Sequence, residues 1–177
     1  MDKLTSILAV VSALVASVGC IISVLQWNSS QKMDRADRVY GLIGLIRTDN
    51  DIRSILYKID YSENWYNEDF HSGVSGIESQ VDRTFTYFSY ICYLESSRVL
   101  NEDEFRFFEY HIDRILKNED SINYLYNIYH WSNKFGIPCS FSCLCDYGRK
   151  KGLLDEAFFD PKSWKDRNNC YFRNLNF

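Results

Sequence analysis

The stretch Leu4–Trp27 reads LTSILAVVSALVASVGCIISVLQW and holds no charged side chain over its 24 residues. As an α-helix it would be about 36 Å long, enough to cross a hydrocarbon core of roughly 30 Å with some tilt. The rest of the chain is charged and aromatic, and the whole sequence holds 12 Phe and 13 Tyr. We therefore predict a transmembrane anchor over residues 1–27.

Other kinds of apolar segment fit this run less well. A secretory signal peptide has an apolar core of about 7–15 residues before a small-residue cleavage site. The segment Ser17-Val18-Gly19-Cys20 resembles a lipoprotein signal, but Ser17 is a poor residue three positions before the Cys. A buried core helix would be unusual at the N-terminus without a polar face. The length of the apolar run and the residues on either side of it favour a membrane span. A signal segment and a buried core helix are the alternatives.

The charges beside the span predict its orientation. Lys32, Arg35 and Arg38 follow the span, whereas Lys3 and the terminal amine precede it. Cytoplasmic flanks of membrane spans are enriched in Lys and Arg. We therefore expect a single-pass protein whose C-terminal domain is cytoplasmic.

Small residues recur on one face of the predicted span, at Ser12, Ala16, Gly19 and Ser23. Such a face lets helix backbones approach closely, so it predicts a homo-oligomer within the lipid bilayer. The alternative is that Ala and Ser are simply common in membrane spans.

The charge is unevenly distributed after the anchor, within a net charge of −4 for the chain. Residues 28–47, expected as a juxtamembrane helix or linker, carry four basic and two acidic side chains. Residues 48–177 are expected to form one cytosolic helical domain. Their acidic middle, with 7 basic and 16 acidic side chains over 48–133, argues against binding to duplex nucleic acid.

Helical signals recur in this domain, and strand signals are scarce. Apolar residues spaced three and four apart, between capping residues and glycines, predict helices. In the first half we expect a helix over 32–46, a helix from a Thr48 cap through Lys58, and a loop over 60–76. A helix over 77–98 follows, and then a helix to about Leu116 that begins at an Asn101–Glu104 capping box. The last two expected helices cover 121–134 and the stretch from a Ser140 cap to Gly152. The fold class is therefore all-α, a bundle of about five to six helices behind the transmembrane helix.

The segment YFSYICYLESSRVLNEDEFRFFEYHIDRIL, Tyr87–Leu116, joins two aromatic helices through a short polar turn with an acidic cap. With the anchor, it resembles a group of bacterial single-pass proteins that carry a compact, aromatic-rich helical domain. The resemblance implies the fold and a place in the bacterial inner membrane, and it carries over no catalytic residue. Small anchored proteins of this architecture often serve in defence or signalling.

Two motifs suggest chemistry, and each has a simpler explanation. Arg106 and His111 have the R-x4-H spacing of the helical HEPN ribonucleases, but the next residue is Phe107, where that family has a polar one. Cys139, Cys143 and Cys145 lie near His130, but their spacing is not that of zinc knuckles. Free, buried thiols are the simpler expectation in a reducing cytoplasm. We expect no enzyme, no cofactor and no metal.

The last third combines cations with aromatic side chains. The candidate ligand-binding residues are Lys134, Arg149, Lys150, Lys151, Trp131 and Tyr147. Such a combination suits phosphates and stacked bases. The simpler explanation, which we favour, is that cations at a helix C-terminus stabilise the helix dipole.

These observations predict a membrane-anchored, cytosolic helical protein of interaction or signalling, in bacterial defence or regulation. The alternative is a ligand-gated membrane effector of a CRISPR- or cyclase-linked antiviral system. Its domain would bind a nucleotide second messenger, such as a cyclic nucleotide, and its oligomerised spans would perturb the membrane.

Overall fold

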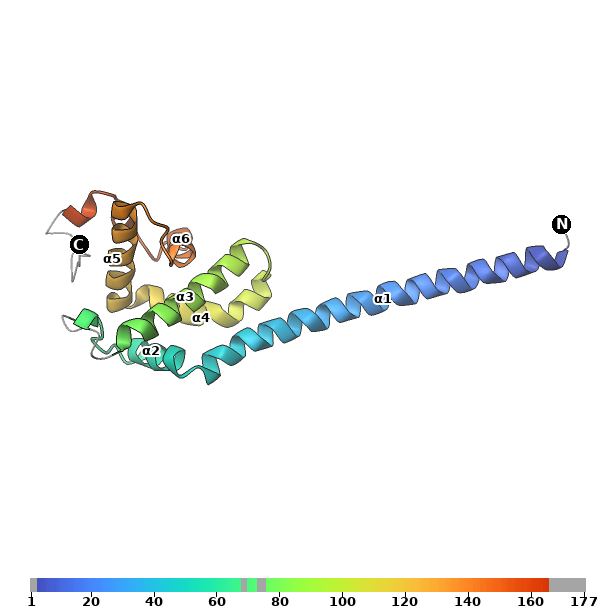
Figure 1. Cartoon of the computed structure of the whole chain (residues 1–177), viewed down its shortest axis with the longest axis horizontal. Coiled ribbons are helices and arrows are strands. Elements are labelled where there is room, and N and C mark those ends of the chain that lie inside the picture. The colour runs from blue at the N-terminus through green and yellow to red at the C-terminus, as the bar shows by residue number, and fades with distance from the viewer. Residues whose placement is uncertain (1–2, 68–69, 73–75, 166–177) are drawn as a thin grey trace. The chain divides into compact units, whose positions relative to one another are not determined.

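The protein is all-α throughout the part that the computed structural model describes, residues 3–67, 70–72 and 76–165 (Figure 1). No strand occurs in these ranges, which confirms the all-α part of the predicted fold class. The α-helices are α1 (Lys3–Thr48), α2 (Asn50–Asp60), α3 (Ile77–Ser96), α4 (Glu102–Lys117), α5 (Glu119–Phe135), α6 (Ser142–Lys150) and α7 (Glu156–Phe159), and the 3-10 helices are η1 (Phe70–Ser72) and η2 (Ser163–Lys165).

The chain divides into two compact units, residues 1–42 and 43–177. In its described part, the first unit consists of α1 up to Leu42. The second holds the last turns of α1 and all later elements. Helix α1 passes without a break through 28–47, where the sequence predicts a juxtamembrane helix.

Across the described residues, no helix is both long enough and apolar enough to cross a membrane. The side chains at 4–6, 8–10 and 13 belong to the predicted span and lie outside the described ones. After Leu25 the helix continues through residues 26–31, where every side chain except that of Trp27 is polar and uncharged.

The second unit is built around α3, which contacts α2, α4 and α6. Its interior is aromatic. Fully buried rings come from η1, from α3 to α5, from α7 and from the segment before η1. They are Tyr66, Phe70, Phe85, Phe88, Phe108, Tyr124, Tyr126 and Phe158. Many of these rings meet edge to face, the arrangement that aromatic pairs prefer.

Local capping signals were partly correct. The Asn101–Glu104 capping box is present, and α5 ends at Gly136 in the left-handed conformation. The Thr48 cap is wrong: Thr48 ends α1, and Asp49 caps α2 because its carboxylate accepts from the Asp51 and Ile52 amides. The Ser140 cap is also wrong, since α6 begins after Phe141 without a side-chain cap.

Candidate functional site

A groove of about 420 Å³ opens between the last turns of α1, α2 and α4 in the second unit. Five of its lining residues are apolar or aromatic, and four carry charged or polar groups. We call this cavity the aromatic groove, and it is lined by Ile43, Ile46, Arg47, Arg53, Leu56, Tyr57, Asp60, Phe107 and His111. Its volume lies within the roughly 300–1,000 Å³ typical of small-molecule pockets.

Two of the polar groups in the groove are already engaged. Arg53 donates from Nη2 to Asn50 Oδ1 at 2.7 Å and from Nη1 to the Arg47 carbonyl at 3.3 Å. Asp60 Oδ1 lies 2.7 Å from Arg114 Nε. These contacts fix both side chains at the edge of the groove.

Two other polar groups lack such contacts. Within the described ranges, neither the Arg47 guanidinium nor the His111 imidazole has a hydrogen-bond or ion-pair partner, although His111 contacts the Phe88 and Tyr110 rings. Burial lowers the pKa of His111 below its ordinary value, so the ring is neutral at pH 7. The groove therefore offers one free cation and one neutral imidazole.

Four exposed aromatic side chains line this groove or contact its lining residues: Tyr57 and Phe107 line it, Tyr61 stacks on Tyr57, and Tyr110 contacts His111. We call them the aromatic rim: Tyr57, Tyr61, Phe107 and Tyr110, exposed by 54%, 74%, 63% and 58%. The Tyr57 and Tyr61 rings stack with centroids 6.3 Å apart. Arg114 joins the rim of α2 to that of α4, because it pairs with Asp60 and donates to the Tyr110 hydroxyl at 2.6 Å. These contacts of Arg114 link the end of α2 to Tyr110 on α4.

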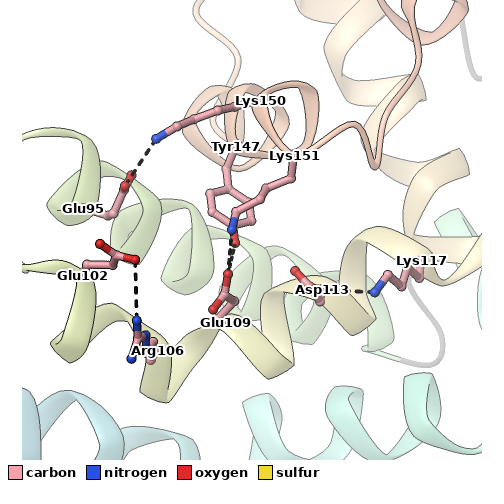
Figure 2. Close-up of polar contacts among 9 residues, drawn as sticks. All are labelled: Glu95, Glu102, Arg106, Glu109, Asp113, Lys117, Tyr147, Lys150 and Lys151. Carbon is pink, nitrogen blue, oxygen red and sulfur yellow. Dashed lines mark hydrogen bonds and ion pairs between the residues drawn. The ribbon is translucent and has the colours of Figure 1, made fainter.

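Three of the predicted ligand residues, Tyr147, Lys150 and Lys151 at the end of α6, lie outside the aromatic groove, against α3 and α4 (Figure 2). Lys151 Nζ lies 2.7 Å from Glu109 Oε1, to which the Tyr147 hydroxyl also donates at 3.2 Å. Lys150 Nζ lies 3.4 Å from Glu95 Oε1. The hydrogen bond from Lys151 lowers the pKa of Glu109. Both lysines are therefore engaged by carboxylates of neighbouring helices.

These residues line a second cavity, of about 270 Å³, together with Glu102, Phe105 and Arg106. We call it the polar seam. Three acidic side chains face three basic ones in it. An anionic ligand would have to displace existing ion pairs there.

The other predicted ligand residues do not line the polar seam. The Arg149 guanidinium lies over the Phe159 ring, 3.5 Å from its centroid. Lys134 lies near the Phe135 and Trp164 rings, and Trp131 contacts Phe135. The structure thus distributes the six residues over several contacts, and ligand binding by them stays a prediction.

The R-x4-H pair is divided between the two cavities. Arg106 lines the polar seam and lies 3.6 Å from Glu102 and 3.4 Å from Asp103. His111, five residues later on α4, lines the aromatic groove. The structure does not bring these two side chains to one cavity.

Of the three cysteines considered as zinc ligands, Cys139 lies before α6, and Cys143 and Cys145 lie on it. Among the described residues, no group of three or more Cys, His, Asp or Glu side chains is placed to hold a metal ion. Instead, a hydrogen bond with Cys145 lowers the pKa of Cys139 to about 7. His130 Nε2 donates to the Phe158 carbonyl at 2.7 Å, a bond that occupies this ring nitrogen.

The small-residue face of α1 is open. Ser12, Ala16, Gly19 and Ser23 are exposed, and Ser23 Oγ donates to the Gly19 carbonyl at 2.9 Å. A Cβ at Gly19 would have no neighbour within 4 Å. Self-association through this face stays a prediction.

Sequence reasoning missed the aromatic groove, although one signal was available. Phe107 and Tyr110 lie off the apolar stripe of α4 that holds Phe105, Phe108 and Ile112. A large aromatic side chain off the core stripe of a helix indicates an exposed surface that can bind a partner.

Comparison with known proteins gives no relative. No protein family, no curated protein and no solved structure matches the chain.

Proposed function

We propose that this protein is a membrane-anchored binding module of interaction or signalling, whose helical domain binds a partner at the aromatic groove and rim. The observation that carries the proposal is the exposure of four aromatic side chains beside an open groove, on a domain with a close-packed core. Interfaces are enriched in aromatic residues and Arg, and contiguous apolar patches on soluble domains mark binding sites.

The proposed location rests on the sequence. The uncharged run of residues 4–27 is long enough to span a bilayer, and the cations at Lys32, Arg35 and Arg38 favour a cytoplasmic domain in the bacterial inner membrane. The exposed small-residue face of α1 supports a homo-oligomer.

A photo-crosslinking amino acid at Tyr61 tests partner binding in cells that express the full chain. The expected result is a crosslinked adduct of defined mass, identified by mass spectrometry and lost when Phe107 is changed to Ser. The control position is Tyr93, because Tyr90 and Tyr93 on α3 form a stacked, exposed pair with the same centroid distance, 6.3 Å. Equal adducts from both positions, or none from Tyr61, would contradict the proposal.

The second candidate is the ligand-gated membrane effector. It is favoured by one observation: Ile43, Ile46 and Arg47, on the helix that also carries the apolar run, line the aromatic groove. A ligand bound there contacts α1 directly. A thermal-shift screen of the full chain with cyclic nucleotides, repeated with an R149A/K150A/K151A variant, tests whether the messenger instead uses the predicted cations of α6.

A further inference from the structure

The aromatic groove is lined by apolar side chains and by polar ones, and the apolar side chains indicate what kind of ligand body fits it. Ile43, Ile46, Leu56 and Phe107 give it an apolar interior. Burial of apolar ligand surface against such side chains contributes roughly 25 cal/mol per Å². A ligand for this groove therefore has an apolar body.

The polar groups of the groove favour negative charge. The lining includes two guanidinium groups, Arg47 and Arg53, and one carboxylate, Asp60. Because Arg114 already neutralises Asp60, the groove has an excess of positive charge. Among the described residues the Arg47 guanidinium donates to no partner, and a guanidinium binds carboxylates and phosphates through paired hydrogen bonds.

From these features we infer that the aromatic groove binds a small amphipathic anion, a free carboxylate on an apolar body, with its head at Arg47 and its body against Phe107 and Leu56. The His111 imidazole faces the same space and supplies a further hydrogen bond. The inference rests on the proposed binding role of this face and adds the chemistry of the ligand. At about 420 Å³, the groove holds one small molecule and is too small for a two-chain phospholipid.

The test uses decanoic acid with a diazirine on its chain, added to vesicles that contain the full chain. After irradiation and trypsin digestion, labelled peptides are mapped. The groove contributes Ser54–Lys58, which contains Tyr57, and Phe107–Arg114, which contains His111. We expect label on these two peptides, competed by unlabelled decanoate, and little label from the matching methyl ester, which lacks the charge.

The Arg47→Gln variant tests the head-group contact. Since a charge-assisted pair is lost, the acid concentration for half-maximal labelling should rise by about tenfold or more. Lys117→Gln, an exposed cation of α4 outside the groove, is the matched control and should behave as the wild type.

Several results would overturn the inference: equal labelling by acid and ester, label confined to the peptide of the apolar run, or an unchanged Arg47→Gln variant. A phospholipid occupant would appear as labelling by a photoreactive phospholipid that decanoate does not compete. A second copy would appear as a crosslinked dimer from Tyr61. If the acid fails while the Tyr61 adduct persists, the ligand inference falls and the proposed function stands. If decanoate labels the groove while Tyr61 gives no adduct, the ligand inference stands and only the proposed binding of a partner falls.

Discussion

The Asp120 carboxylate accepts a hydrogen bond from the Trp65 backbone amide at 2.7 Å, across 55 positions of sequence. The same oxygen accepts from the Tyr66 amide at 3.0 Å. Asp120 is only 6% exposed, so this bond pair fixes the segment after α2 to the start of α5 inside the aromatic core.

We expect Asp120→Ala to lower the free energy of unfolding by about 3 kcal/mol, because it leaves two buried amides without an acceptor. Asp120→Asn is the control, since it keeps an acceptor oxygen and removes only the charge, and it should cost less. Urea unfolding of the full chain measures both. An alanine variant within about 0.5 kcal/mol of wild type would contradict the role of Asp120.

Gly148 on α6 packs closely against the side chains of two leucines. A Cβ there would lie 2.8 Å from Leu154 Cδ1 and 3.4 Å from Leu116 Cδ1, and both leucines are buried. Gly148→Ala should therefore destabilise the protein by about 1–3 kcal/mol through overpacking.

Gly44 on α1 is the matched position, because a Cβ there meets nothing within 4 Å. Gly44→Ala should be stabilising by up to about 1 kcal/mol, since Ala favours helix more than Gly. Thermal unfolding that ranks the two variants the other way would refute the packing of α6.

Protonation of the buried His130 and the half-buried His111 should weaken the fold in acid. Burial lowers the pKa of His130, and likewise of His111, below the ordinary value of about 6.5. The unfolded chain therefore binds more protons than the folded one, and the free energy of unfolding decreases as the pH falls below about 6.5. His130→Gln should reduce this slope between pH 7 and pH 5, and a double variant with His111→Gln should reduce it further. Unfolding curves with unchanged slopes would contradict the burial argument.

Self-association in membranes should depend on Ala16 and Gly19. Changing both to Leu keeps the helix apolar but fills the small-residue face, so the oligomer should weaken while membrane insertion persists. Val18→Leu with Val24→Leu enlarges other faces of α1 and serves as the control. A two-hybrid reporter for association within the inner membrane compares the variants. If both pairs associate as the wild type does, this face is not the interface.

The sequence predicted what depends on neighbouring residues. Asn101 and Glu104 are three positions apart and form their capping box without help from other helices. The same local reasoning misplaced a cap at Thr48, because Asp49 is the better acceptor for the first amides of α2.

Side-chain partners from distant segments escaped such reasoning. The sequence suggested that Lys150 and Lys151 are available to a ligand. In the structure Lys150 contacts Glu95, 55 positions earlier, and Lys151 contacts Glu109, 42 positions earlier. The aromatic groove is likewise assembled from the end of α1, from α2 and from α4. Only the tertiary fold brings these residues together.

Topology of the full chain in a bacterial cell is the most direct test of a membrane-anchored, cytoplasm-facing binding module. An alkaline phosphatase fused after Phe177 is active only in the periplasm, whereas a fluorescent protein fused there fluoresces only in the cytoplasm. We expect the chain in the inner-membrane fraction, with a silent phosphatase and a bright fluorescent fusion, and moving the cations of Lys32, Arg35 and Arg38 to the N-terminus should weaken this orientation. A strongly active phosphatase, or a chain recovered wholly outside the membrane fraction, would contradict the proposal.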